Sequence, residues 1–171
     1  MIEMIVDSVR VNLISPSRVV VLKERDGPRY LAIVIGQGEA DAIAVKLQDH
    51  DVPRPLTHDL LKQLIESVSG SVERVVVTDL VDTTFFATIV LDVGGSRCEL
   101  DSRPSDAIAL AVRANAPILV EPSVLNEAGF EPDTDGEEAG EGEPVAEEKL
   151  EVFREFINQL DLDDLDKSST G

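Results

Sequence analysis

A cluster of ionisable and hydroxyl side chains lies at residues 101–106, directly before the most apolar run of the chain. Its members are Asp101, Ser102, Arg103, Ser105 and Asp106. Pro104 suits the first position of a helix, and Asp106 then places an acid in the first helical turn. Six apolar residues follow at 107–112. We therefore expect a helix here that other elements cover on all sides.

The position of this cluster favours two roles. The first turn of a helix offers free backbone N–H groups and the positive end of the helix dipole, and both attract an anion such as phosphate. Ser105 and Asp106 also belong to the residue types that cap helices. We expect capping to be at least part of what these two residues do.

A second cluster of similar composition lies at residues 54–59, again before a predicted helix. It supplies a guanidinium, a hydroxyl, an imidazole and a carboxylate in Arg54, Thr57, His58 and Asp59. Thr57 is the expected N-cap of that helix. If the cluster has a structural role only, His58 and Asp59 are solvated side chains in the first turn; the alternative is a functional role for both.

The two clusters together suit phosphodiester cleavage if they face each other across one cleft. His58 would act as general acid or base, and Arg54 or Arg103 would neutralise developing negative charge. A nearby acid would orient the His or bind a metal ion.

The spacing of possible metal ligands gives limited support for a metal site. One Cys and two His exclude the ordinary zinc sites. Mg²⁺ is the candidate cofactor only if the fold gathers scattered carboxylates, namely Glu39, Asp59, Asp101 and Asp106. The segment at residues 36–38 lacks the further glycine and the Lys of known phosphate-binding loops.

Strand and helix patterns alternate along the chain. Strand patterns cover residues 2–14, 19–23, 30–35, 72–81, 84–93, 97–100 and 117–121, with turns at 26–28 and 94–95. A glycine-started helix is expected from residue 36 to near Leu47. A second helix is expected to begin at Thr57 and to end at Gly70.

Three strands and a helix recur in the same order in the two halves of the pattern. At an offset of 65 residues, the Asp-Ala-Ile-Ala sequence at 41–44 falls on the same four residues at 106–109. Neither unit could bury its apolar faces alone. The expected fold is therefore α+β, with a duplicated β-β-β-α repeat that forms one compact domain.

The formal net charge of −19 is unevenly distributed. Residues 1–130 hold 12 Lys or Arg against 19 Asp or Glu, whereas residues 131–171 hold 3 against 15. We expect a domain at 1–130, a disordered acidic linker at 131–145, an amphipathic helix at 146–161 and a polar tail at 162–171. An acidic domain argues against broad electrostatic binding of nucleic acid, which would then contact a few Arg residues or a metal ion.

Other features of the composition limit the class of protein. No apolar run approaches the ~18 residues that span a membrane, and no signal-like N-terminal stretch is present. We expect a cytoplasmic protein without a membrane partner. A homo-oligomer is expected because paired sheet halves leave apolar surface to cover, and a short amphipathic helix is expected to dock on its own domain, another protomer or a protein partner.

Three motifs in order resemble the bifunctional nuclease family, also catalogued as a domain of unknown function and found in bacteria and plants. They are IGQGEA at 35–40, RPLTHDLL at 54–61 and DSRPSDAIA at 101–109, and the resemblance covers roughly residues 4–130. Plant members are described as having both RNase and DNase activity. The resemblance implies an α+β fold and a nuclease that cleaves RNA, DNA or both.

The candidate site follows from the motif positions. Its expected catalytic residues are His58, Asp59, Arg54, Arg103, Asp101 and Asp106, and its expected substrate-binding residues are Thr57, Ser105 and Glu39, with nucleic acid as the partner. The alternative is a non-enzymatic regulatory module that binds a protein or an anion and whose polar motifs are architectural. The net charge and the lack of a known catalytic constellation favour that alternative.

Overall fold

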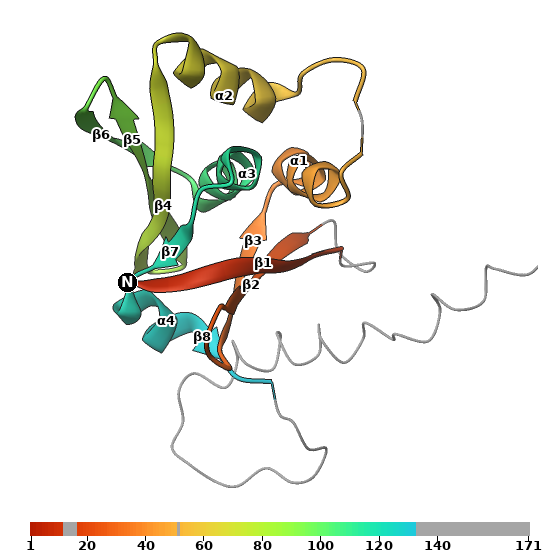
Figure 1. Ribbon diagram of the computed structural model, residues 1–171. Coiled ribbons are helices and arrows are strands. Elements are labelled where there is room, and N and C mark those ends of the chain that lie inside the picture. Colours follow the sequence, from red (N-terminus) through yellow and green to blue (C-terminus); the bar gives the residue numbers. More distant parts are fainter. Residues whose placement is uncertain (12–16, 51, 133–171) are drawn as a thin grey trace, which may run out of the picture. The chain divides into compact units, whose positions relative to one another are not determined.

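Eight strands and four helices make up the part of the chain that the computed structural model describes, residues 1–11, 17–50 and 52–132 (Figure 1). The strands are β1 (Ile2–Val11), β2 (Arg18–Glu24), β3 (Tyr30–Ile35), β4 (Gly70–Val81), β5 (Thr84–Val93), β6 (Ser96–Ser102), β7 (Ile118–Val120) and β8 (Gly129–Phe130). The helices are α1 (Gln37–Leu47), α2 (Thr57–Ser67), α3 (Pro104–Ala114) and α4 (Pro122–Ala128).

The strands form one sheet in the order β6-β5-β4-β7-β1-β2-β3-β8. Strands β1, β2 and β3 form one antiparallel meander, and β4, β5 and β6 form another. Strand β7 joins them, because Ile118 pairs with Met4 of β1 in antiparallel fashion and with Val75 of β4 in parallel fashion. The predicted α+β class is confirmed, while descent of the two meanders from a duplicated repeat stays a prediction.

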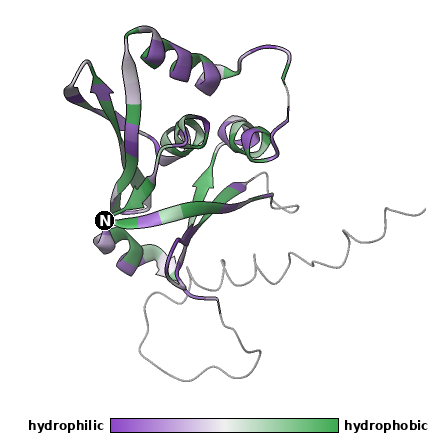
Figure 2. Cartoon of the chain, in the orientation of Figure 1, coloured by the Kyte–Doolittle hydropathy of each residue, from purple (hydrophilic) through white to green (hydrophobic). Residues whose placement is uncertain are grey.

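Helix α3 lies in the core, as its apolar sequence predicts. Ile108, Ala109, Leu110 and Ala111 are fully buried, and α3 packs against α1, α2, β4 and β5. Its Ala and Leu content favours a helix, Pro104 occupies the first turn, and Asn115 ends it in the left-handed conformation with φ 53°. Figure 2 shows hydrophobic residues through α3 and recurring hydrophilic residues along α2.

Both predicted boundaries of α2 were wrong, and two short elements were not predicted. The N-cap of α2 is Leu56, and the predicted cap Thr57 is the first helical residue. Gly70 does not end α2, because the chain leaves the helix through Ser69 at φ 58° and Gly70 already begins β4. Helix α4 and strand β8 were not predicted, since Pro122 and the short segments around it carry little periodic pattern.

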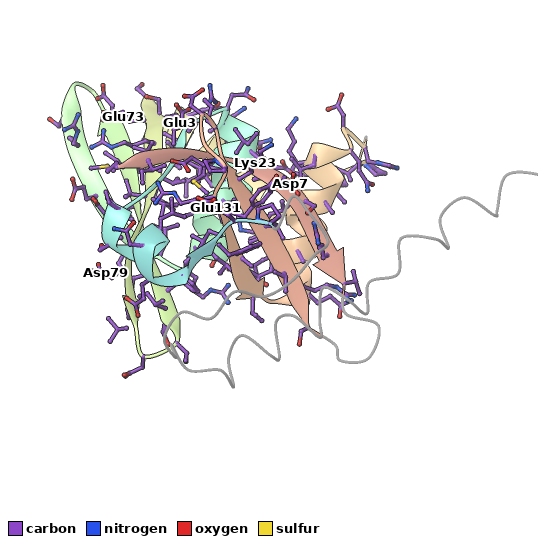
Figure 3. The ribbon with its side chains drawn as sticks, turned by 90° about the horizontal axis from the view of Figure 1, so that it is seen from below. Glu3, Asp7, Lys23, Glu73, Asp79 and Glu131 are labelled. Carbon is purple, nitrogen blue, oxygen red and sulfur yellow. The ribbon has the colours of Figure 1, made fainter. Side chains whose placement is uncertain are left out.

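Figure 3 labels five acidic residues and one Lys of the described unit, seen from below. Glu3 and Asp7 lie on β1, Glu73 and Asp79 lie on β4, Glu131 follows β8, and Lys23 lies on β2. Ion pairs offset part of this negative charge, because Glu3 pairs with Arg25 and Glu73 pairs with Arg74 and Arg97.

Several predictions concern residues beyond the described ranges. Residues 12–14 of the first predicted strand, the linker after Pro132, the amphipathic helix and the tail lie there. No helix in the described ranges has the length and apolarity needed to span a membrane. The cytoplasmic location, the homo-oligomer and the protein partner stay predictions.

Candidate functional site

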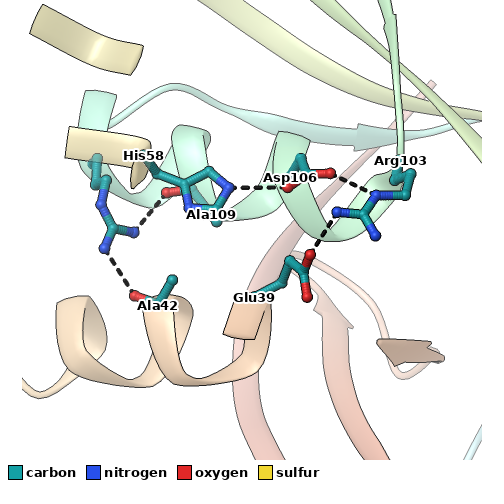
Figure 4. Close-up of polar contacts among 7 residues, drawn as sticks. Glu39, Ala42, His58, Arg103, Asp106 and Ala109 are labelled. Atoms are coloured by element: carbon teal, nitrogen blue, oxygen red, sulfur yellow. Dashed lines mark hydrogen bonds and ion pairs between the residues drawn. The ribbon is translucent and has the colours of Figure 1, made fainter. Parts of the chain in front are cut away.

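The first turns of three helices meet through side-chain contacts. Glu39 lies in the first turn of α1, His58 in that of α2 and Asp106 in that of α3. Arg103, the N-cap residue of α3, donates from Nη2 to Glu39 Oε1 at 2.5 Å and from Nε to Asp106 Oδ2 at 2.8 Å. Asp106 Oδ1 lies 3.0 Å from His58 Nε2. Figure 4 shows these four residues in a row, which we call the polar chain.

The geometry of His58 indicates which proton it carries. The residue is only 7% exposed. Its Nδ1 is buried and has no hydrogen-bond partner among the residues that the structure describes. A proton on Nδ1 would bury an unpaired donor, which costs free energy. A proton on Nε2, in contrast, is donated to the Asp106 carboxylate, which only accepts, so His58 orients that carboxylate.

Arg103 is the exposed cation of the polar chain. Its side chain is 66% exposed, and that of Asp106 is 29% exposed. Hydrogen bonds to Asp106 first and to Glu39 second raise the pKa of the Arg103 guanidinium above its ordinary value. Arg103 therefore stays charged, and an incoming anion can reach it from solvent.

A second set of hydrogen bonds, all made by Arg113, connects α2 with α1 and α3. The sequence analysis did not name Arg113 as a candidate residue. Arg113 is 5% exposed. Its guanidinium donates from Nε to Asp59 Oδ1 at 2.8 Å, from Nη1 to the Ala109 carbonyl at 2.9 Å and from Nη2 to the Ala42 carbonyl at 3.0 Å. One residue thus connects all three helices whose first turns form the polar chain.

A sequence signal for Arg113 was present. It follows the six apolar residues of α3 directly and lies seven positions, about two helical turns, after Asp106. A charged residue on the same face of a buried helix needs a buried partner. Asp59, then expected to be solvated or catalytic, is that partner.

The carboxylate of Asp59 is held in its charged form. Burial alone would raise the pKa of Asp59, but the Leu56 backbone N–H and the Arg113 guanidinium outweigh burial and lower this pKa below its ordinary value. Asp59 Oδ2 accepts the Leu56 N–H at 2.9 Å, which is one half of a capping box. Asp59 therefore links the start of α2 to α3.

The predicted site residues fall into three groups. Glu39, His58, Arg103 and Asp106 form the polar chain. Arg54 and Asp59 line a separate pocket of about 360 Å³ together with Arg113. Thr57 and Asp101 are exposed, and Ser105 is buried at the start of α3. The two clusters therefore meet through His58 and Asp106, while Arg54 does not take part in that contact.

The polar chain offers two carboxylates to a metal ion. No group of three or more His, Cys, Asp or Glu suited to a metal occurs within residues 1–11, 17–50 and 52–132. Mg²⁺ is often held by one or two carboxylates, with water and substrate phosphate oxygens as its other ligands. Glu39 and Asp106 are both bound to Arg103, so they would hold Mg²⁺ only after Arg103 releases them. Asp59 is bound to Arg113, and Asp101 lies exposed on β6.

Comparison with known proteins gives a family and several relatives. The model of the bifunctional nuclease domain matches residues 20–133. The uncharacterized protein Rv1829 of Mycobacterium tuberculosis is 41% identical over 163 residues, which are 95% of this chain and 96% of that protein.

Plant relatives match over a shorter range. Bifunctional nuclease 1 of Arabidopsis thaliana is 31% identical over 110 residues, which are 62% of this chain and 34% of the plant protein. Bifunctional nuclease 1 of Oryza sativa subsp. indica is 30% identical over 110 residues, or 33% of its own length. The family match covers most of the described fold and includes all four residues of the polar chain, and the chain belongs to the bifunctional nuclease domain family.

Proposed function

We propose that this protein is a nuclease that hydrolyses phosphodiester bonds of RNA or DNA at the polar chain. The observation that carries the proposal is that the first turns of three helices meet in one chain of contacts, whose exposed member is the guanidinium of Arg103. Helix N-termini and Arg both favour a phosphate group. The plant relatives named bifunctional nucleases support the chemistry, although this chain spans only about a third of their length.

Each member of the polar chain has a role in this reaction. Arg103 binds the phosphate and stabilises the charge that develops on its oxygens. The carboxylate of Asp106 accepts a proton from the attacking water, whose oxygen bonds to phosphorus as the ester P–O bond breaks. The leaving oxygen takes a proton from solvent. His58 donates a hydrogen bond from Nε2 to Asp106, keeps its proton, and so acts as a positioning residue.

Glu39 balances the charge of Arg103 before substrate arrives. Mg²⁺, if it takes part, would be held by Glu39 and Asp106 and would supply further positive charge to the phosphate oxygens. The sequence-based role of His58 as direct general base is the less favourable one, because its free nitrogen is buried. Asp106, with 29% of its side chain exposed, can reach a water molecule.

The second candidate function is a non-enzymatic module that binds an anion at the same helix N-termini. The observation that favours it is that both carboxylate oxygens of Asp106 already accept hydrogen bonds, from His58 and from Arg103, so that neither oxygen is held free for an attacking water. Such a protein would bind phosphate-bearing ligands and leave them intact. Cleavage therefore separates the two functions.

The experiment is cleavage of labelled single-stranded RNA and DNA by purified full-length protein, with and without Mg²⁺. We expect Arg103→Gln and Asp106→Asn to lower the cleavage rate at least ~100-fold, in line with the loss of a preorganised charge or a general base. Arg97→Gln is the matched control, since Arg97 is another exposed Arg, paired with Glu73 and outside the polar chain. Equal rates in wild type and both site variants would reject the proposed site, and no cleavage by the wild type would favour the binding module.

A further inference from the structure

A second pocket adjoins Arg103 on the side of β3. It measures about 350 Å³, and three segments line it: residues 32–36 at the end of β3, residues 83–85 at the turn into β5, and residues 103–105 at the start of α3. Arg103 lines this pocket and also belongs to the polar chain. A ligand bound in the pocket therefore lies beside the proposed phosphate site.

The pocket combines apolar walls with hydroxyl groups. Val34, Ile35 and Phe85 provide apolar surface, and Val34 is exposed although it is a large hydrophobic residue. Thr83, Thr84 and Ser105 provide hydroxyls. Ligand sites typically show this combination of apolar walls and a few polar groups.

Ser105 is the residue that points most directly to a ligand. It is 6% exposed and lines the pocket. It lies in the first turn of α3, two residues after Arg103. A hydroxyl both donates and accepts hydrogen bonds, so Ser105 can meet the polar edge of a ligand in this pocket.

We propose that this pocket binds the base of the nucleotide whose phosphate contacts Arg103, so that the substrate is single-stranded nucleic acid. A flat aromatic base can pack on Phe85 while its polar edge meets Ser105, and the attached phosphate then reaches Arg103. A base paired within a duplex enters a pocket only after it has been flipped out of the stack, which costs a few kcal/mol, so the pocket favours an unpaired base. This inference rests on the nuclease function proposed above and names its substrate class.

Other pockets and other kinds of ligand have less support in the described unit. In the pocket that contains Arg54, the buried Arg113 already has a hydrogen bond at each of its nitrogens, so that pocket holds no unpaired buried group. A purely apolar ligand in the pocket beside Arg103 would make no hydrogen bond with the hydroxyls of Thr83, Thr84 and Ser105. A nucleotide satisfies both the apolar walls and the polar groups.

The test measures binding of two dye-labelled, phosphorothioate-linked five-nucleotide DNA strands to the full-length protein by fluorescence anisotropy. One strand carries thymine bases and the other is an abasic sugar-phosphate chain of the same length. We expect wild type to bind the base-bearing strand at least about tenfold more tightly, the size of one stacking contact. Annealing that strand to its complement should remove the preference.

Two variants and a control assign the preference to the pocket. Phe85→Leu and Ser105→Ala should each reduce the base-to-abasic affinity ratio at least about threefold. Phe86→Leu changes the neighbouring residue on the opposite face of β5, which does not line the pocket, and should leave the ratio unchanged. Equal binding of both strands by wild type, or equal loss in the Phe85 and Phe86 variants, overturns the inference.

Cleavage of ordinary oligonucleotides by the same preparations separates this inference from the proposed function. Cleavage without base preference in binding overturns the pocket assignment and leaves the nuclease standing. Base preference without cleavage supports the pocket as a nucleotide site and rejects the nuclease. If the wild-type protein neither cleaves nor prefers the base-bearing strand, both proposals are rejected.

Discussion

Replacement of the buried Arg113 by Met tests whether this residue holds α1, α2 and α3 together. Met keeps the unbranched apolar stem and removes the guanidinium with its three hydrogen bonds. The Ala42 and Ala109 carbonyls lie inside helices, where carbonyls also accept backbone hydrogen bonds. The principal loss is therefore the contact with Asp59.

The size of the loss follows from the burial of the two partners. Removal of one member of a buried ion pair costs about 3–5 kcal/mol, because the other charge is left without its partner. The Asp59 side chain is 29% exposed and keeps its hydrogen bond from Leu56, so the cost should fall at the lower end. We expect Arg113→Met to lower the free energy of unfolding by about 3 kcal/mol, out of the roughly 5–15 kcal/mol of an ordinary domain.

Urea unfolding followed by far-ultraviolet circular dichroism measures this change, because the chain contains no Trp. Arg97→Met is the control: Arg97 pairs with Glu73 on the surface with its side chain 57% exposed, and exposed pairs contribute at most about 1 kcal/mol. If Arg113→Met costs no more than Arg97→Met, Arg113 does not fix the helices. Cleavage by the Arg113 variant should also fall, since α2 positions His58 against Asp106.

Two further predictions concern Glu39 and Asp59. A Cβ at Gly36 would clash with the carboxylate of Glu39, so Gly36→Ala should displace Glu39 from Arg103 and lower cleavage at least about threefold with little loss of thermal stability. Gly38→Ala is the control, because its Cβ meets nothing within 4 Å, and this variant should keep full activity. Because the pKa of Asp59 is lowered in the folded state, its contribution to stability is present above the unfolded pKa of about 3.9 and is lost at lower pH. Asp59→Asn should thus make the unfolding free energy less steep below about pH 4 in urea titrations, and an unchanged slope would contradict the lowered pKa.

Periodic patterns in the sequence were sufficient to predict most of the described elements. Strand β5 was predicted with its observed bounds, and the turn at Gly94 and Gly95 has the positive φ angles that two glycines allow. The order of the strands in the sheet was not predicted. This order depends on β7, a strand of three residues that pairs with both β1 and β4. The sequence of so short a strand does not indicate which other strands it pairs with.

The sequence motifs named the four members of the polar chain among a larger set of residues, but they did not predict how these four are arranged. The clusters do meet, since His58 contacts Asp106 across 48 residues of sequence. The adjacent residues His58 and Asp59 nevertheless have different partners on α3. His58 contacts Asp106 in the first turn of α3, and Asp59 contacts Arg113 in its last turn. A sequence motif treats neighbouring residues as one unit. In a helix, however, consecutive side chains point about 100° apart around the axis, so neighbours in a motif can contact different partners.

The two Arg residues at opposite ends of α3 lie in opposite electrostatic environments. Arg113 is in the last turn, where the helix dipole favours a cation. Arg103 lies at the positive end of α3, near the N-termini of α1 and α2, where a cation is disfavoured. Glu39 and Asp106 offset that cost in the free protein. A substrate phosphate would take over this neutralising role and release carboxylate oxygens from Arg103, so that binding itself would free Asp106 to accept a proton.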